Sequence, residues 1–458
     1  MPTGLDWVAG DKLGLPATNT DPYNSETVEV ATYDANTGVV TLSEPLKGYH
    51  FGDSRSTGDE YNGVDMRGEV LLLSSNVNVT ASTDAASMTN AYPHPFGCQI
   101  LVSDFFEPGT MEYRAGAIKF DNVAVYNCSQ EHTEYAALRF EQAQQGEKIV
   151  TNSAISSGLG EGIIIRNSAG LTLENNVIHD FILFGIHAAT SSDLTVRGNV
   201  LNGVRNVNEE YPNYDRWEEP PGGMDFRGCS DFTVQDNIVA STWHHGFRLP
   251  GHACGAPNPH TGNVAHSIAG YGVIVYTGPA ACTEFRQFAG YKNRRGDLHL
   301  GGGVGAAIHR VRDVTSIDSK VGVMALGAPA GRVEVSDSYF YGGRNMPNED
   351  CPAGFDCTGC LERRGLMLPV FGEHQTETKK APMKLTQMYA FGGSWGGTSL
   401  FKNLRFIGWD ADLNACGAEQ SAIGTDWEHP DYHPIAHFED ILFENTDESA
   451  MFKFDAPN

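Results

Sequence analysis

Hydrophobic and polar residues alternate in short runs along most of the chain, and one arrangement of these runs occurs three times. The copies begin at Gly162, Gly185 and Gly223, so the first two are 23 residues apart and the third follows after 38. In each copy an apolar residue directly follows the glycine, further apolar residues lie 9 and 11 positions after it, and an asparagine lies 14 positions after it. Alternating apolar residues between Gly, Asn and Ser–Asp turns predict short β-strands.

Strands that recur with this period predict an all-β fold, a right-handed parallel β-helix (solenoid) with loop insertions, in which each coil lies about 4.8 Å from the next. A single coil cannot bury its own apolar face, so the fold is stabilised by the stacking of neighbouring coils. We therefore expect interior ladders of equivalent residues. These are Ile163, Ile186 and Met224, and Leu171, Leu194 and Phe232.

The equivalent asparagines Asn176, Asn199 and Asn237 are predicted to mark a sharp turn in each coil. Asparagine tolerates a left-handed backbone, and stacked side-chain amides can hydrogen-bond along the axis of the fold. We interpret these residues as a structural ladder and not as a binding site.

Strand patterns extend beyond the three copies. Residues 1–82 form one strand-rich region, with alternating runs at 27–34 and 39–42. Residues 97–458 carry the predicted β-helix, with a further strand-like run at 117–129. Two stretches, 205–221 and 344–384, interrupt the β-helix pattern and are predicted to be loop insertions.

The net charge of the chain excludes some classes of binding partner. The 458 residues include 57 acidic and 31 basic side chains, a formal net charge of −26. This balance argues against nucleic acid and anionic membranes, and it suits an extracellular surface, a calcium-rich medium or cationic partners. No apolar run approaches the ~18 residues of a membrane span. The residues after Met1 lack the basic start and apolar core of a signal peptide.

Six of the nine cysteines lie in loop-like segments and are candidates for disulfide bonds, with the pairing left open: Cys254, Cys282, Cys351, Cys357, Cys360 and Cys416. Crowded loop cysteines in an acidic chain favour an oxidising compartment. The triplet within residues 351–360 leaves zinc binding as an alternative, which needs a fourth ligand from elsewhere. Cys128 and Cys229 lie in strand-like contexts that suit buried free thiols. Sequons at Asn78 and Asn127 are candidate N-glycosylation sites if the protein is secreted.

Several segments resemble a known extracellular family. Three segments resemble the second half of the domain that is named for its eight conserved glycines: WVAGDKLGL (7–15), VTLSEPLKGYHFG (40–52) and MRGEVLLLSSNVNVTAS (66–82). That domain is found in fibrocystin, fibrocystin-L and the cell-surface hyaluronidases. Three further segments resemble the parallel β-helix region that follows this domain in fibrocystin-L: GCQILVSDFF (97–106), FDNVAVYNCSQ (120–130) and GLGEGIIIRNSAGLTLENN (158–176). The resemblance implies a large extracellular or cell-surface glycoprotein, often ciliary, within which this chain begins mid-domain and stops early. Because an exposed last coil is an open sheet edge, we also expect further polypeptide to abut both ends.

The hyaluronidases of this superfamily carry a strand of the form Tyr-Pro-Ile-His-Phe-His. The matching residues 135–140 of this chain contain no histidine, so they offer neither a metal ligand nor a neutral-pH base. The resemblance therefore favours the non-enzymatic, fibrocystin-like branch over hyaluronan cleavage.

One dense group of imidazoles and a thiol is a candidate for zinc or copper: His244, His245, His252, Cys254, His260 and His266. The group lacks a closely spaced His-x3-His pair, and a loop held by a disulfide explains the segment around Cys254 equally well. We therefore assign no metal ligand from the sequence.

Carboxylates on neighbouring coils offer the pairs, ~5–9.5 Å apart, that glycosidases need. The candidates are Asp225 with Arg227 on one strand face, Asp236, and the flanking Glu161, Asp180 and Asp193. Such pairs also arise by chance in a chain with 57 acidic residues, where solvation of the surface is the simpler interpretation. The aromatic residues Tyr211, Tyr214 and Trp217 suit stacking of a sugar, anchoring of a protein partner, or a lid on the β-helix.

We therefore expect a non-enzymatic structural or recognition glycoprotein in a larger cell-surface, ciliary or flagellar assembly, with no catalytic residues and with calcium as the one cofactor left open. The expected partners are other extracellular proteins, copies of the same chain, or glycans, without nucleic acid and without direct membrane insertion. The first alternative is a carbohydrate-active enzyme, a hyaluronidase-like polysaccharide hydrolase or lyase that uses carboxylates on the flank of the β-helix. The second is a calcium-dependent adhesion module.

Overall fold

The computed structural model describes residues 2–52, 61–81, 97–130, 133, 135–205, 222–276, 281–300, 308–325, 332–342, 363–368, 398–410, 420–424 and 435–453. The chain divides into two compact units. The first comprises Met1–Leu249, Pro259–Ile274 and Phe288–Arg295, and the second comprises Pro250–Asn258, Val275–Gln287 and Gly296–Asn458. Within the described ranges, no helix has the length and hydrophobicity that crossing a membrane requires.

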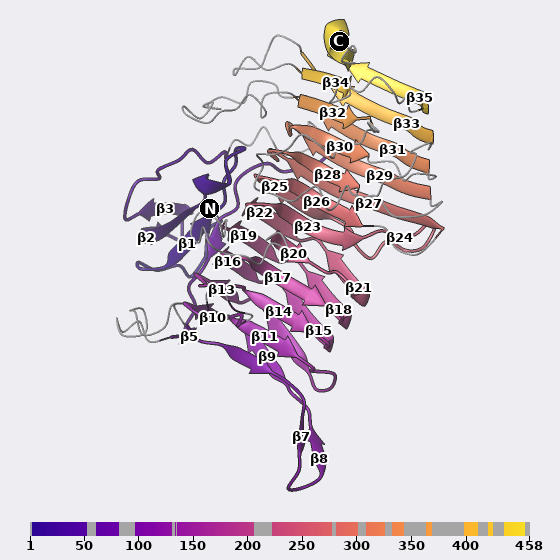
Figure 1. Ribbon diagram of the computed structural model, residues 1–458. Helices are drawn as coiled ribbons and strands as arrows, with labels where there is room; N and C mark the ends of the chain where they lie inside the picture. Colours follow the sequence, from indigo (N-terminus) through magenta and orange to yellow (C-terminus); the bar gives the residue numbers. More distant parts are fainter. Residues whose placement is uncertain are drawn as a thin grey trace, which may run out of the picture. The chain divides into compact units, whose positions relative to one another are not determined.

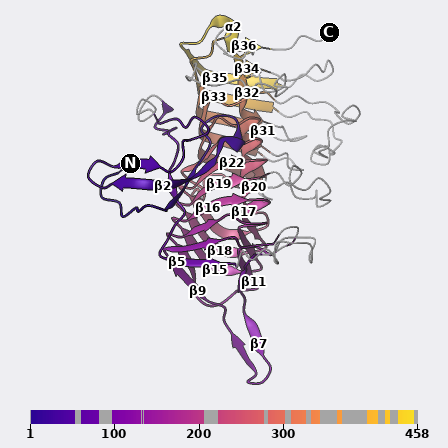
Figure 2. The same cartoon turned by 90° about the vertical axis from the view of Figure 1, so that its left-hand side faces the viewer.

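The first unit begins with a small antiparallel sheet in the order β3-β2-β1-β4 (Figure 1). Its strands are β1 (Lys12–Leu15), β2 (Glu26–Asp34), β3 (Val39–Leu42) and β4 (Leu71–Leu72), and the 3-10 helix η1 (Pro22–Asn24) lies between β1 and β2. Leu13 and Val30 are buried in its core. Asp21 caps η1, because its carboxylate accepts a hydrogen bond of 3.0 Å from the Tyr23 backbone. In Figures 1 and 2 this sheet lies beside strands β16, β19 and β22 of the same unit.

The rest of the first unit is a parallel β-helix with three sheets. The β16 sheet contains β5 (Val77–Thr80), β10 (Val123–Tyr126), β13 (Ala154–Ser156), β16 (Val177–Phe181), β19 (Val200–Val204), β22 (Ile238–Thr242), β25 (Asn263–His266) and the end of β27 (Cys282–Tyr291). The β17 sheet contains β6 (Ile100–Val102), β11 (Leu138–Glu141), β14 (Ile163–Arg166), β17 (Phe184–Ala189), β20 (Gly222–Asp225), β23 (His245–Pro250) and β26 (Tyr271–Tyr276). The β18 sheet contains β9 (Ile118–Asp121), β12 (Lys148–Thr151), β15 (Ala169–Glu174), β18 (Ser192–Arg197) and β21 (Ser230–Gln235).

The predicted ladders are confirmed. Ile163 pairs with Ile186 and Ile186 with Met224 in parallel register, and all are buried. Leu171, Leu194 and Phe232 form the equivalent ladder in the β18 sheet. Each coil therefore buries its apolar face against the next, as stacking requires.

The asparagine ladder is also present, but the turn is made by a different residue. Asn176, Asn199, Asn237 and Asn263 follow one another inside the fold, each linked to the next by two hydrogen bonds of 2.9–3.1 Å. The left-handed backbone belongs to the preceding position in each coil, which is Asn175, Gly198, Asp236 or Gly262, with φ between 55° and 69°. Because the preceding residue adopts the left-handed φ, the side-chain amides of the ladder can form hydrogen bonds along the axis of the fold.

A hairpin formed by β7 (Phe105–Glu107) and β8 (Glu112–Arg114) projects from the first coil of this unit (Figures 1 and 2). Its aromatic side chains are exposed, and the rings of Phe106 and Tyr113 contact each other at 5.1 Å.

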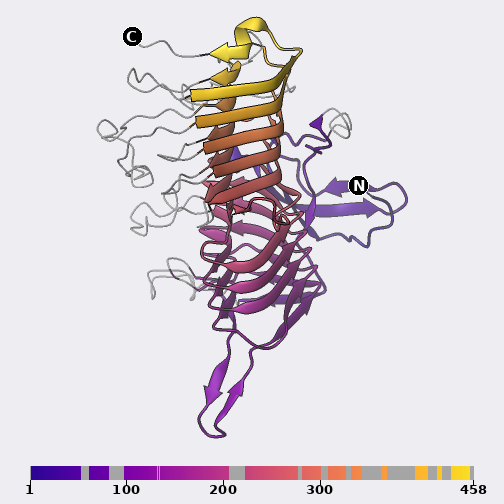
Figure 3. The same cartoon turned by 90° about the vertical axis from the view of Figure 1, so that its right-hand side faces the viewer.

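The second unit contains parallel strands in two sheets. One contains β29 (Ile308–Ile317), β31 (Arg332–Tyr341), β33 (Thr398–Ile407) and β35 (Ile435–Glu444), and Figure 3 shows these long strands stacked. The other contains β28 (Gly296–Leu300), β30 (Val321–Ala325), β32 (Arg363–Met367), β34 (Gln420–Gly424) and β36 (Phe452–Lys453). The short β24 (His252–Ala253) pairs with the beginning of β27, and α2 (Glu448–Met451) precedes β36.

Each long strand bends at a residue with left-handed φ near its middle: Asp313, Asp337, Asn403 and Asp440, at 50–54°. After the first of these bends the Val314 backbone donates to the buried Ser338 hydroxyl at 3.1 Å, as the Val123 backbone donates to Ser153 in the first unit. In the second unit, one long strand therefore bends through a corner, whereas in the first unit the equivalent corner lies between two separate strands.

The strands differ from the prediction at β32, which lies inside the predicted insertion at 344–384, and at β5, which lies within residues 1–82 but pairs with β10 of the β-helix. The five residues of β32, Arg-Arg-Gly-Leu-Met, are too few to stand out within a long irregular stretch. Most of that insertion, and residues 206–221 of the other one, lie outside the described residues.

Among the described residues there are two disulfides, Cys254–Cys282 and Cys98–Cys128. The expectation of a free thiol at Cys128 was wrong, because the parallel bridge between neighbouring coils places Cys98 opposite it. Cys229 is a free cysteine, and burial raises the pKa of its thiol to about 11. Cys351, Cys357, Cys360 and Cys416 lie outside the described residues.

Candidate functional site

Charged side chains gather on the outer face of the β17 sheet. Side chains alternate between the two faces of a strand, so the neighbours of the interior ladder point outward. Strand register places His187 beside Asp225, and Asp225 beside Arg248, in three successive coils. His187 and Asp225 are nevertheless only 5% and 0% exposed. A row of buried ionisable groups on an outer face needs partners for its charges.

Asp225 has two cationic partners. Arg227 Nε lies 2.9 Å from Oδ2 and 3.1 Å from Oδ1 of the carboxylate, and the Arg227 backbone also donates to Oδ1. Arg248 Nη1 lies 3.7 Å from Oδ2. Because a buried carboxylate is stable only when it is paired and hydrogen-bonded, the two guanidinium groups hold Asp225 in place.

Glu161 has a different partner in the same region. Its Oε2 lies 3.3 Å from Nδ1 of His187, and both side chains are buried. The Phe184 ring packs on the His187 imidazole with the ring centroids 4.5 Å apart. Glu161 is therefore paired with an imidazole that also packs on an aromatic ring.

His244 and His245 end this group, with their Nδ1 atoms 3.0 Å apart. His245 is completely buried, and burial lowers the pKa of its imidazole well below 6.5, an effect to which the nearby His244 and Arg248 add. The imidazole of His245 is consequently neutral near pH 7.

The other histidines of the predicted metal group have separate partners. His252 Nε2 lies 3.7 Å from Glu284, and Cys254 is in a disulfide. His260 packs against Phe232, while His266 lies 3.2 Å from Glu69 and stacks on Tyr291. Among the described residues, no three His, Cys, Asp or Glu side chains are arranged to hold a metal ion.

The remaining predicted carboxylates are dispersed. Asp236 lies 3.5 Å from Arg197, Asp193 is exposed, and Asp180 lies 2.7 Å from Arg205. Tyr211, Tyr214 and Trp217 lie outside the described residues.

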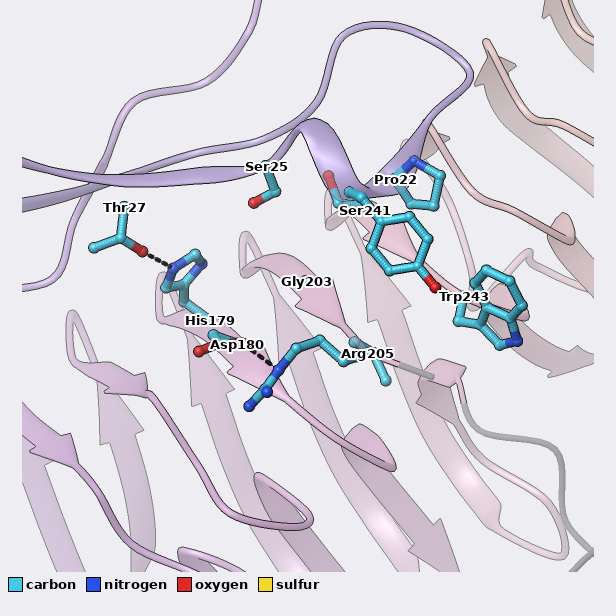
Figure 4. A pocket seen from close by; sticks show the side chains of 11 residues that line it. Pro22, Ser25, Thr27, His179, Asp180, Gly203, Arg205, Ser241 and Trp243 are labelled. Atoms are coloured by element: carbon cyan, nitrogen blue, oxygen red, sulfur yellow. Dashed lines mark hydrogen bonds and ion pairs between the residues drawn. The ribbon is translucent and has the colours of Figure 1, made fainter. Parts of the chain in front are cut away.

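A separate pocket of about 220 Å³ lies between the N-terminal segment and the outer face of the β16 sheet, within the first unit. The pocket is lined by Pro22, Tyr23, Ser25, Thr27, His179, Asp180, Gly203, Val204, Arg205, Ser241 and Trp243. Figure 4 shows Thr27 and His179 at one end, Trp243 at the other, and Asp180 and Arg205 between them. Of these residues, only Asp180 was a candidate from the sequence. The N-terminal residues that complete the pocket carry no local signal of this role.

Hydrogen bonds fix the N-terminal segment over this pocket. Thr27 Oγ1 lies 2.8 Å from Nε2 of His179, and Ser25 exchanges hydrogen bonds with the Asn202 amide. The Ala17 backbone donates to the Ser241 hydroxyl at 3.0 Å. Burial lowers the pKa of His179, so this imidazole accepts or donates as a neutral group.

Comparison with known proteins gives the relationships of the chain. A family profile described as a right handed beta helix region matches residues 111–286. Fibrocystin of Canis lupus familiaris is 24% identical over 332 residues, which cover 70% of this chain and 7% of that protein. The chain is therefore distantly similar to fibrocystin. Fibrocystin-L of Homo sapiens is 24% identical over 273 residues, covering 56% of this chain and 6% of the relative.

These matches confirm the predicted right-handed β-helix and its distant similarity to fibrocystin and fibrocystin-L. The chain spans only 6–7% of the length of these relatives. Among solved structures, the catalytic domain of a GH87 alpha-1,3-glucanase in complex with nigerose aligns with a TM-score of 0.37 and 10% identity, covering 78% of this chain and 61% of that one. The similarity to fibrocystin and the two disulfides indicate a secreted or extracellular region.

Proposed function

We propose that the chain is a non-enzymatic recognition element of a larger extracellular surface protein, related to fibrocystin. The observation that carries this proposal is the pairing of the best-placed carboxylates with cations or imidazole. Asp225 faces Arg227 and Arg248, and Glu161 faces His187. Hydrolysis of a glycosidic bond needs two carboxylates that face the substrate, one as an acid and one as a base or nucleophile.

The distant similarity to fibrocystin over 70% of the chain agrees with this function. The net charge of −26 favours a solvated surface with protein or neutral glycan partners. A place on a cell surface, a cilium or a flagellum is part of the same proposal.

A degradation assay with paired variants tests the proposal. The protein is incubated with a panel of glycosaminoglycans and other extracellular polysaccharides, and newly formed chain ends are measured over time. We expect no sustained product release from the wild type. We also expect Asp225→Asn to lower the free energy of unfolding by about 3 kcal/mol, because it leaves two guanidinium groups without their carboxylate. Asp193→Asn, at an exposed carboxylate, is the matched control and should change neither quantity.

The same assay tests the alternative function, a carbohydrate-active enzyme. The burial of Asp225 and Glu161 on an outer face is the observation that favours a carbohydrate-active enzyme. Sustained product release that is abolished by Asp225→Asn or Glu161→Gln, but kept by Asp193→Asn, would replace our proposal with that function.

A further inference from the structure

The floor of the pocket is shaped by one backbone feature repeated in three coils. Strand register places Gly203 level with Asp180 in the preceding coil and with Ser241 in the next. All three residues have a left-handed φ, which is 61° at Asp180, 80° at Gly203 and 55° at Ser241. The backbone therefore bends at the same point in β16, β19 and β22.

Gly203 leaves the middle of this floor open. A Cβ atom there would make only ordinary contact, 3.6 Å from the Asp180 backbone, so the space above it is not filled by a neighbour. In the next coil Ser241 binds the Ala17 backbone, which closes that side. The hollow thus results from a missing side chain between two polar ones.

Polar groups line one side of the hollow. Asp180 and Arg205 form an ion pair of 2.7 Å, and each side chain keeps 37% of its surface exposed. A carboxylate next to a guanidinium presents an acceptor beside donors in a fixed arrangement. This arrangement fits two adjacent hydroxyl groups, one of which donates while the other accepts.

Aromatic rings form the opposite wall. The rings of Tyr23 and Trp243 lie 5.6 Å apart and are tilted by 42°, and Tyr23 is 42% exposed. Such side chains offer an apolar face with a polar tip. A ligand that packs a C–H face on these rings and turns hydroxyl groups toward Asp180 is a sugar ring.

We propose that the pocket formed by Tyr23, Asp180, Arg205 and Trp243 binds a single neutral pyranose residue of a glycan. The inference rests on the proposed recognition function, and it adds the ligand class and the site. The pocket of about 220 Å³ is below the ~300–1,000 Å³ of sites for larger ligands, so it holds one ring and not an oligosaccharide. Its paired charges and the net charge of −26 disfavour an anionic sugar.

Binding is tested with methyl glycosides of glucose, galactose, mannose and N-acetylglucosamine, with glucuronate as the charged comparison. Saturation-transfer NMR and titration report binding to the whole chain. We expect a Kd in the millimolar range for at least one neutral glycoside, as is usual for one small ligand with few contacts. Asp180→Asn should weaken this binding at least tenfold, because asparagine keeps the left-handed backbone but loses the charge that pairs with Arg205.

Matched variants separate binding from folding. Trp243→Ala should also weaken binding at least tenfold, whereas Trp7→Ala removes a similar tilted pair, Trp7–Tyr33, outside the pocket and should leave binding unchanged. Asp193→Asn is the control for Asp180→Asn. If Trp243→Ala lowers the Tm, the result for Asp180→Asn decides.

Three outcomes would overturn the inference: binding that Asp180→Asn leaves unchanged, no saturation transfer to any neutral glycoside, or tighter binding of glucuronate than of glucose. The two proposals fail separately. Product release from polysaccharides would overturn the non-enzymatic function and leave this pocket as a sugar site, whereas binding that ignores the pocket variants would overturn the pocket alone.

Discussion

At the scale of single residues, each turn between the β18 and β16 sheets depends on two adjacent positions with different roles. Asn175 makes the bend with a φ of 56°, and Asn176 inside the turn carries the hydrogen bonds. Asn199 shows how much one ladder amide does. Its Oδ1 accepts from the backbone and side chain of Asn176, and its Nδ2 donates to Leu173 and Asn237. The amide therefore satisfies polar groups of three coils that water does not reach.

We expect Asn199→Ala to lower the free energy of unfolding by about 3 kcal/mol or more, because it leaves several buried polar atoms without partners. Chemical denaturation measures the loss. Asn175→Gly is the matched control, since glycine adopts the same left-handed φ and Asn175 is exposed, and it should change stability by less than about 1 kcal/mol. Equal effects of the two variants would contradict the division of roles.

At the scale of elements, the two sequons lie in unlike surroundings. Asn78 is exposed on β5. Asn127 is only partly exposed, has a left-handed φ of 53°, and precedes the disulfide-bonded Cys128. The hydroxyl of Ser129, which completes the second sequon, is buried and accepts a hydrogen bond of 2.8 Å from Gly160.

We therefore predict that a secreted form of the chain carries a glycan at Asn78 and none at Asn127. Mass spectrometry before and after enzymatic deglycosylation measures this. Asn78→Gln should remove the whole glycan mass, while Asn127→Gln should remove none. A glycan at Asn127 would mean that modification precedes closure of this coil.

The boundaries of the strands show how much of the fold could be predicted from the sequence. The alternation at 27–34 and 39–42 predicts β2 and β3 nearly to the residue. The run at 117–129 suggests one strand, whereas the structure has β9 and β10 with a left-handed Asn122, φ 58°, between them. Apolar alternation continues through such a corner, so periodicity alone cannot locate it.

At the scale of the whole molecule, the candidate sites depend on contacts that no local pattern encodes. The sequence singled out Asp225, but its second partner Arg248 comes from the next coil. The pocket joins residues near position 25 to residues more than 150 positions later, as in the contact of Thr27 with His179, at a separation of 152. Repeats predict which coils are neighbours, but they do not predict where a separate N-terminal segment packs on them.

The way in which this segment packs makes the first unit sensitive to pH. His179 holds Thr27 and contacts Asn202, and burial lowers its pKa below the ordinary 6.5. The pKa of His245 is lowered for the same reason. When the folded-state pKa of an imidazole is depressed, the unfolded chain binds more protons between the two pKa values, so stability rises with pH in that window. The stabilisation is complete above about pH 6.5 and is lost as the pH falls below it, by up to about 1.4 kcal/mol per pH unit for each histidine.

We accordingly expect the Tm to be constant from pH 8 to 7 and to fall steadily from pH 6.5 to 5. His179→Gln removes one titrating group, so it should lower the Tm at pH 7.5 but make the decline below pH 6.5 shallower. His437→Gln, at an exposed histidine on β35, is the control and should leave the profile unchanged. Thermal unfolding across this pH range measures all three profiles. A wild-type Tm that rises on acidification would mean that protonated histidines stabilise the fold, and it would contradict the neutral contact between His179 and the N-terminal segment.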